Sequence, residues 1–394
     1  MGSTRTVAVL GAGTMGHGIA EVLAIHGIQV NVRDIERRFL DNAKQKIEWS
    51  LKKLQEKNQI NENAERIMSR LSFELDMQKA VRDCDLIIEA VPEDINVKKD
   101  IFRQLDLYTK SSAILATNTS SLPIGEISSA VKDPSRVVGI HFFNPPVMMK
   151  LVEVIRSTST SDKVVRDAIS LAKEISKVPI LVQKDVPGFI VNRLLVRMMV
   201  TARLLVEKRM ATVEEVDSVL KYGAKLPMGA FELADYIGLD VITFVEKAMS
   251  QRGFHVPLGT LIEDKVREGK LGVKTGSGFY TYTKEQPKPV IPLELSSKIN
   301  SALILAPSVN EAAWLLSNSV ASKDDIEVGV KLGLGFPEGL LHMADEWGID
   351  VIISSLKSLY KATGEAWLEP QQLLLSMVSE GRLGRKSKKG FFEY

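Results

Sequence analysis

The sequence predicts a doubly wound α/β domain followed by an all-α, tandemly duplicated region. Two observations support this prediction. Short apolar runs alternate with helical patterns up to about residue 182, and only helical patterns follow from Gln183 onward. At 394 residues the chain is also too long for one ordinary core. We therefore expect three domains, over residues 1–182, 183–299 and 300–394.

The first domain opens with a strand, a tight glycine turn, a helix and a second strand. "TVAVL" is a short, continuous apolar run, and Ile19, Val22 and Leu23 then have helical spacing before Gly27. Residues 36–58 form a Lys-rich helical pattern that is too polar for a core helix, so we expect it to stand partly away from the sheet. Further strands are expected at 71–75, 85–91, 113–120 and 136–143, with helices at 77–83, 95–105 and near Pro123.

The second half of the chain contains an internal repeat. "LPMGAFELADYIGLDVI" (226–242) matches "FPEGLLHMADEWGIDVI" (336–352) at an offset of 110 residues, and "EGKLGVKTGSGFYTY" returns as "EGRLGRKSKKGFFEY". The Pro-rich stretch 283–294 between the copies has the composition of a linker. These matches predict two helical domains of one design.

Composition excludes several classes of function. A net charge of +2, without basic runs that alternate with aromatic residues, argues against nucleic acid and membrane surfaces as partners. No run approaches the roughly 18 apolar residues of a membrane span, and we expect no targeting segment. Cys84 is the only cysteine, so a disulfide within the chain and a cysteine-based metal site are excluded. We expect a cytoplasmic protein without a metal, in which Cys84 is a small core residue.

"GAGTMG" fills the pattern G-x-G-x-x-G with Gly11, Gly13 and Gly16, and Thr14 and Met15 lie between the last two. It follows a predicted buried strand and opens a predicted helix, which is the context that a Rossmann-type dinucleotide site requires. The first glycine allows the turn, the second lets backbone approach a pyrophosphate, and the third lets the helix pack closely. The motif predicts a dinucleotide cofactor, NAD or FAD.

Asp34 ends the second strand, 23 residues after Gly11. A carboxylate at this place accepts hydrogen bonds from ribose hydroxyls and repels a 2′-phosphate, which favours NAD over NADP. The alternative is that Arg33, Arg37 and Arg38 turn inward and bind a phosphate.

"HFFNPPVMMKLVEVI" (141–155) predicts a hairpin. If its turn is centred on Val147, His141 lies directly opposite Glu153. A carboxylate beside an imidazole fixes its tautomer and stabilises the imidazolium, which would suit a general acid or base. The alternative is that His141 is a satisfied core residue.

Two polar clusters occur at the ends of predicted elements. "TNTSS" (117–121) ends a parallel strand, where ligands bind in such sheets, and "DVPGFIVNR" (185–193) places Asn192 about one turn into a helix. Capping and turn chemistry is the alternative explanation for Asn118, Ser120 and Ser121.

Taken together, these motifs resemble the L-3-hydroxyacyl-CoA dehydrogenases, of the 3-hydroxybutyryl-CoA dehydrogenase type. "GAGTMGHGIA", "EAVPEDINVKKDIF", "ATNTSSLPI", "HFFNPPVMMKLVEVI" and "KDVPGFIVNRLL" occur in that family's order, and the resemblance spans essentially the whole chain. It implies an NAD-dependent enzyme that interconverts (S)-3-hydroxyacyl-CoA and 3-ketoacyl-CoA.

The resemblance also implies roles for individual residues. His141 would be the general base, oriented by Glu153, while Ser120 would bind the reacting oxygen and Asn192 the thioester side. Glu93, Lys98 and Asn118 would contact the nicotinamide half of NAD, and the Lys-rich arm 36–58 would cover the CoA moiety. The duplicated C-terminal domain would replace a dimer interface, so the protein would be a monomer or a homodimer. A dehydrogenase of free 3-hydroxy acids and an NAD-binding protein without turnover are the alternatives.

Overall fold

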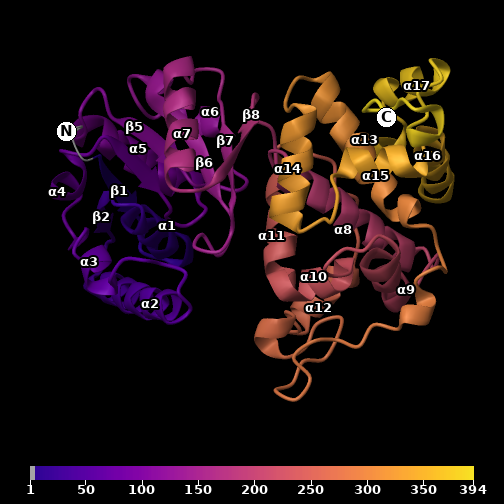
Figure 1. The fold of residues 1–394 in the computed structure, drawn as a ribbon, viewed down its shortest axis with the longest axis horizontal. Coiled ribbons are helices and arrows are strands. Elements are labelled where there is room, and N and C mark those ends of the chain that lie inside the picture. The colour runs from indigo at the N-terminus through magenta and orange to yellow at the C-terminus, as the bar shows by residue number, and fades with distance from the viewer. Residues whose placement is uncertain (1–4) are drawn as a thin grey trace. The chain divides into compact units, whose positions relative to one another are not determined.

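The computed structural model describes residues 5–394 and confirms the predicted fold class. The chain divides into two compact units, one ending at Phe189 and the other running from Ile190 to Tyr394 (Figure 1). The first unit is an α/β domain and the second is helical.

The first unit is built on an eight-stranded sheet in the order β3-β2-β1-β4-β5-β6-β7-β8. All neighbouring strands pair in parallel except β6 and β7, which are antiparallel. The strand order reverses between β1 and β4, and in open α/β sheets ligands bind at such a switch point. The strands are β1 (Thr6–Leu10), β2 (Gln29–Arg33), β3 (Leu71–Glu74), β4 (Leu86–Glu89), β5 (Ile114–Thr117), β6 (Val137–Phe142), β7 (Leu151–Ile155) and β8 (Val178–Val182).

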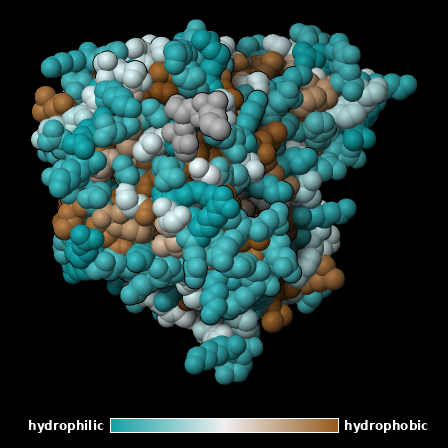
Figure 2. Space-filling view, turned by 60° about the vertical axis from the view of Figure 1, so that its left-hand side comes forward, coloured by the Kyte–Doolittle hydropathy of each residue, from teal (hydrophilic) through white to brown (hydrophobic). Residues whose placement is uncertain are grey.

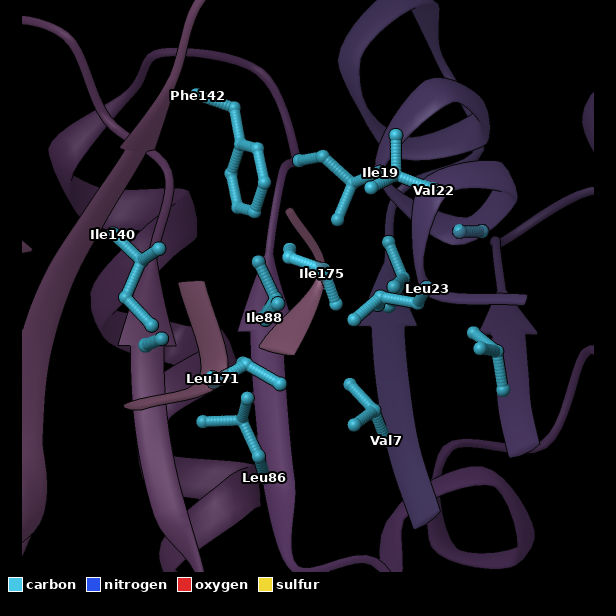
Figure 3. Packing of buried hydrophobic residues seen from close by; sticks show 14 of the residues in the cluster. Val7, Ile19, Val22, Leu23, Leu86, Ile88, Ile140, Phe142, Leu171 and Ile175 are labelled. Atoms are coloured by element: carbon cyan, nitrogen blue, oxygen red, sulfur yellow. The ribbon is translucent and has the colours of Figure 1, made fainter. Parts of the chain in front are cut away.

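Helices cover both faces of this sheet. The side chains of α1 and α7 pack on one face, where Ile19, Leu23 and Ile175 lie over Val7 and Ile88 (Figure 3). The short helices α4 and α6 contact strands of the sheet as well, and α5 packs beside them. The helical segments are α1 (Thr14–Ile25), α2 (Arg37–Glu56), α3 (Ala64–Met68), α4 (Met77–Val81), α5 (Ile95–Tyr108), α6 (Ile124–Ser128), η1 (Pro134–Arg136) and α7 (Asp162–Glu174).

Helix α2 is the Lys-rich arm. Its buried residues are Leu40, Ala43, Ile47 and Leu51, which are spaced three or four apart and form one apolar stripe. Ile47 and Leu51 pack with Ala24 of α1 and with α3, while most other residues of α2 are polar and exposed. The helix is therefore held by one narrow face, as its polar composition predicts.

The pleat of β6 and β7 determines where the polar residues of the hairpin lie. Ile140, Phe142, Val152 and Val154 belong to the core cluster on the α1 and α7 face. Because successive side chains alternate across a sheet, His141 and Glu153 lie on the opposite face. The predicted register is confirmed, since His141 pairs directly with Glu153.

The second unit consists of two helical repeats. Helix α10 begins at Ala230 and α15 at Leu340, which keeps the offset of 110 residues. The segments are α8 (Val191–Glu207), α9 (Val213–Ser218), η2 (Val219–Gly223), α10 (Ala230–Ile237), α11 (Leu239–Gln251), α12 (Leu261–Arg267), η3 (Val273–Thr275) and η4 (Leu293–Leu295), then α13 (Ser301–Ser317), α14 (Lys323–Leu334), α15 (Leu340–Trp347), α16 (Ile349–Thr363), η5 (Ala366–Leu368), α17 (Gln372–Ser379) and η6 (Arg385–Ser387).

One buried aspartate anchors the last segment of each repeat. Asp235 on α10 accepts hydrogen bonds from the backbone N–H groups of Phe279 and Tyr280 and from the Tyr282 hydroxyl. Asp345 on α15 accepts the same three kinds of bond, from Phe391, Phe392 and Tyr394. The two copies thus share these tertiary hydrogen bonds as well as a sequence pattern.

The face of the molecule that Figure 2 shows is mainly polar. Hydrophilic residues predominate on it, and hydrophobic residues form small separate groups. Along residues 5–394, no helix combines the length and the apolar character needed to cross a membrane.

Candidate functional site

The glycine-rich turn after β1 gives each of its three glycines a separate structural reason. Gly11 has φ +94°, and a Cβ there would lie 2.5 Å from the Ala90 carbonyl oxygen. A Cβ on Gly16 would lie 1.7 Å from the Gly11 carbonyl oxygen, so only glycine lets α1 pack this close to the turn. A Cβ on Gly13 would meet no described atom within 4 Å. Gly13 therefore faces open space, as the approach of a pyrophosphate requires.

The N-terminus of α1 suits an anion. Gly13 is the N-cap, Thr14 and Met15 are the first helical residues, and in the described chain no side chain caps the helix and no acid lies in its first turn. The free N–H groups and the helix dipole there favour a phosphate. The turn and the helix together fit the pyrophosphate of a dinucleotide.

Asp34 lies just beyond β2, beside this turn. Its Oδ2 accepts a hydrogen bond of 2.6 Å from the Ala12 N–H, which holds the carboxylate against the glycine loop. Arg33 donates to the Leu75 carbonyl oxygen, and Arg38 pairs with Glu36. These two arginines are thus engaged elsewhere, which favours a cofactor without a 2′-phosphate.

His141 and Glu153 form a buried pair. His141 Nδ1 lies 2.8 Å from Glu153 Oε2, and the Glu153 side chain is fully buried. Because a carboxylate accepts, Nδ1 is the donor in this bond, and Nε2 is left as the basic nitrogen of the neutral ring. The rings of Phe143 and Phe189 flank the imidazole, with centroids 4.7 and 5.9 Å away. The ring therefore has a fixed orientation.

Asn118 connects the end of β5 to this pair. Its Oδ1 accepts a hydrogen bond of 2.8 Å from the N–H of Phe142, the residue after His141. Its own N–H donates to the Glu89 carbonyl oxygen. The loop that begins at Asn118 and carries Ser120 is thus fixed beside the end of β6.

Glu93 organises that loop. Its Oε1 accepts hydrogen bonds from the Thr119 hydroxyl, from the N–H of Ser120 at 3.0 Å and from the hydroxyl and N–H of Ser121. Burial alone would raise the pKa of Glu93, but the Lys98 ammonium and these hydrogen bonds outweigh it, so the pKa is lowered. Glu93 therefore stays ionised and holds Ser120 through its backbone.

A buried ion pair lies behind Glu93. Lys98 Nζ is 2.6 Å from Glu89 Oε1 and 3.3 Å from Glu93 Oε2, and the Lys98 side chain is only 1% exposed. Glu89 Oε2 also accepts from the Thr117 hydroxyl. Glu89 was not among the residues predicted from the sequence. The signal that could have identified it is a charged residue inside the apolar run "DLIIEAV", which is predicted to be a buried strand.

The Lys-rich arm borders a cleft of about 500 Å³. Lys46 and Lys53 of α2 and Lys57 just after it line one side, and the hairpin turn 144–148 lines the other. Lys177 supports that turn from behind by donating hydrogen bonds to the carbonyl oxygens of Pro146 and Met149. Burial lowers the pKa of Lys177 to about 8.

The structure brings most of the predicted residues together in the first unit and places one elsewhere. Asn192 belongs to the second unit, where it is the second residue of α8 rather than one full turn into the helix. Its predicted contact with substrate stays a prediction.

The first unit combines a Rossmann-type sheet, an uncapped helix behind three glycines and a buried pair of His141 on β6 with Glu153 on β7. This combination is typical of a dinucleotide-dependent dehydrogenase. Sequence comparison makes this specific. Residues 6–186 match the family described as 3-hydroxyacyl-CoA dehydrogenase, NAD binding domain, and residues 188–282 and 302–394 each match its C-terminal domain. The chain belongs to the 3-hydroxyacyl-CoA dehydrogenase family, its cofactor is NAD, and the duplication of its C-terminal domain is confirmed.

Individual relatives agree with this assignment. A probable 3-hydroxyacyl-CoA dehydrogenase of Caenorhabditis elegans is 41% identical over 292 residues, which cover 72% of this chain and 98% of that protein. The crystal structure of 3-hydroxybutyryl-CoA dehydrogenase from Escherichia coli is 28% identical with a TM-score of 0.85, over 96% of this chain and 99% of that one. The dehydrogenase part of multifunctional enzyme 1 from C. elegans is also 28% identical, with a TM-score of 0.64, over 95% and 89% of the two chains.

Proposed function

We propose that this enzyme oxidises (S)-3-hydroxyacyl-CoA to 3-ketoacyl-CoA, and catalyses the reverse reaction, with His141 as the general base. The observation that carries the proposal is the hydrogen bond of 2.8 Å between His141 Nδ1 and Glu153 Oε2. NAD, when bound, supplies the acceptor for the substrate hydride. The glycine turn, the N-terminus of α1 and Asp34 would hold it.

In this mechanism His141 accepts the proton of the substrate 3-hydroxyl at Nε2. Glu153 stabilises the imidazolium that results and keeps the ring in the required tautomer. Ser120 donates a hydrogen bond to the reacting oxygen, and Asn192 binds the thioester side of the substrate. General acid–base catalysis of this kind contributes on the order of 10²–10⁴ in rate.

We assign the cleft beside α2 to the CoA moiety. The diphosphate and the 3′-phosphate of CoA are anionic, and Lys46, Lys53 and Lys57 supply positive charge along one wall. The opposite wall, from Asn144 to Met148, is part of the hairpin that carries His141 and Glu153. The hairpin turn 144–148 would therefore contact the CoA moiety, and the strands on either side of it carry His141 and Glu153.

The first experiment follows NADH absorbance after acetoacetyl-CoA is added to the purified protein. NADPH, free acetoacetate and the variant His141→Gln are measured alongside. Consumption of NADH with the thioester only, lowered at least about 10²-fold in the variant, is the expected result. Equal rates with free acetoacetate would overturn the assignment of the cleft to CoA. Full activity in His141→Gln would overturn the role of the base.

We further propose that the second C-terminal copy replaces a subunit interface. Its helix α13 packs against α8 of the first copy, where Glu311 pairs with Arg193 and, at 2.8 Å, with Arg197. The Arg193 and Arg197 guanidinium groups also stack on Trp314 and Trp367, respectively. Light scattering behind size exclusion tests this directly. A mass near the 43.6 kDa of one chain supports the proposal, and a stable dimer formed through the second unit would contradict it.

A further inference from the structure

Glu21 is a buried acid at the cleft beside α2. It lies on α1, one turn after His17, and both residues line the cleft. Glu21 is 1% exposed, and its Oε1 has no hydrogen-bond partner among residues 5–394. A buried carboxyl oxygen left without a partner is costly, so its position at a ligand-sized cleft is evidence for a partner that arrives with the ligand.

The surroundings of Glu21 favour the neutral form of its carboxyl group, in comparison with a glutamate exposed to water. Burial raises the pKa of Glu21 to about 7, against a smaller opposing effect of a hydrogen bond from Ser50. A neutral carboxyl donates one hydrogen bond and accepts others, whereas the ionised form only accepts. The anionic CoA moiety would be repelled by the ionised form and would accept a hydrogen bond from the neutral one.

We propose that Glu21 is a positioning residue of the CoA cleft, whose neutral carboxyl donates a hydrogen bond to an acceptor on the CoA moiety. This inference rests on the proposed function, because it takes the cleft to be the CoA site. It makes CoA affinity depend on the protonation of Glu21, so that CoA binds more weakly as the pH rises and the carboxyl ionises.

Other charged groups face the same cleft. On α1 the relevant group is His17, whose Nδ1 lies 2.7 Å from the Gly13 carbonyl oxygen. Burial lowers the pKa of His17, and the nearby Lys46 lowers it further. On α2 and directly after it the groups are Lys46, Lys53 and Lys57, while the hairpin turn 144–148 brings no titratable side chain to the cleft. Among these groups burial raises the pKa of Glu21 and lowers that of His17, so the two titratable residues of α1 shift in opposite directions.

The test compares the wild type with Glu21→Gln, which keeps the size of the side chain and a hydrogen-bond donor but cannot ionise. The Kd of CoA is measured by calorimetry from pH 6 to 8.5, and kcat and KM with acetoacetyl-CoA are measured in parallel. Titration of the CoA phosphates and of His17 is common to both proteins, so the ratio of their Kd values isolates Glu21. We expect the wild-type Kd to rise roughly tenfold more than that of the variant over this range.

A second variant separates recognition from folding. Glu21→Leu has neither donor nor acceptor, so we expect weaker CoA binding at every pH while the Kd of NADH stays unchanged. Parallel pH profiles of wild type and Glu21→Gln would overturn the role of Glu21 even if the enzyme is fully active. Failure of the wild type to bind CoA at any pH would overturn both this inference and the assignment of the cleft. CoA binding with the expected pH profile, but without turnover, would overturn only the proposed reaction.

Discussion

Glu153 Oε2 lies 2.8 Å from His141 Nδ1, directly across the antiparallel pair of β6 and β7. The strands that carry these residues are buried along their whole length, so the backbone on both sides of the pair is fixed by the core. The pair is thus positioned by the sheet itself and not by a mobile loop. This rigidity is what a general base needs if its orientation is to be kept through turnover.

Replacing Glu153 with Gln should lower kcat for acetoacetyl-CoA reduction by about 10²–10⁴-fold. The amide can donate to the ring as well as accept from it, so the imidazole is no longer restricted to one tautomer, and the imidazolium loses its counter-charge. The Kd of NADH, measured by fluorescence, should not change, because the glycine turn is untouched. A kcat within about threefold of wild type would contradict the role given to Glu153.

Replacing Glu93 with Gln should reduce both stability and activity. The carboxylate accepts from the Ser120–Ser121 segment and faces the buried Lys98, so we expect a loss of about 1–3 kcal/mol in the free energy of unfolding. Glu126→Gln is the matched control, since Glu126 pairs with Lys99 at the surface, where such a pair contributes about 0–1 kcal/mol. Denaturant unfolding and kcat of both variants give the comparison. Equal losses in the two variants would show that Glu93 does not organise the loop.

The sequence predicted those parts of the site that depend on local pattern. The glycine turn, Asp34 and the facing of His141 and Glu153 follow from strand ends, turn length and the two-residue period of a strand. A hairpin brings its residues together whatever surrounds it. The two helical copies could also be predicted, because their sequences match at a constant offset whatever their surroundings in the fold.

The remaining contacts depend on packing between different elements of the fold, which no local pattern encodes. Glu89 and Lys98 are only nine residues apart, but they pair because the chain turns back between β4 and α5. Lys177 reaches the hairpin turn only because β8 pairs with β7. Glu21 has the spacing of a solvated position on an amphipathic helix, yet α2 covers it. In each case the polar residue was visible in the sequence and its burial was not.

Replacing Lys46 with Glu should raise KM for acetoacetyl-CoA by roughly tenfold at low salt, because it places a negative charge in the wall assigned to CoA. The effect should shrink as ionic strength rises, since the site is open to solvent. Lys52→Glu is the matched control, because Lys52 is also exposed on α2 but does not line the cleft. If both variants raise KM equally, the effect belongs to the net charge of the arm and not to the cleft.

Replacing Asp345 with Ala should destabilise the second copy by about 2–4 kcal/mol, because the buried Phe391 N–H, the half-buried Phe392 N–H and the Tyr394 hydroxyl lose their acceptor. Asp350→Ala is the matched control. Asp350 pairs with Lys386 at the surface, and each side chain is more than 40% exposed, so its loss should cost well under about 1 kcal/mol. Thermal unfolding of the two variants provides the measurement, and equal shifts in Tm would show that the Asp345 contacts do not anchor the last segment.

Replacing Glu21 with Gln should change how stability depends on pH even when no ligand is present. The pKa of Glu21 is about 7 in the folded protein against an ordinary value of 4.5, so the folded state binds the proton more tightly than the unfolded state. The stabilising contribution is therefore fully present below about pH 4.5, and it is lost as the pH rises through 7. A shift from 4.5 to about 7 corresponds to at most about 3.5 kcal/mol.

Urea unfolding of both proteins at pH 5 and pH 8.5 measures this contribution directly. The other titrating groups are common to the two proteins, so their effects cancel in the difference between the free energies of unfolding. We expect Glu21→Gln to gain stability relative to wild type on going from pH 5 to pH 8.5, since only the wild type must bury a carboxylate at the higher pH. A difference that does not change with pH would mean that Glu21 ionises in the folded protein as easily as in water. The inference that its carboxyl group is neutral at the cleft would then be wrong.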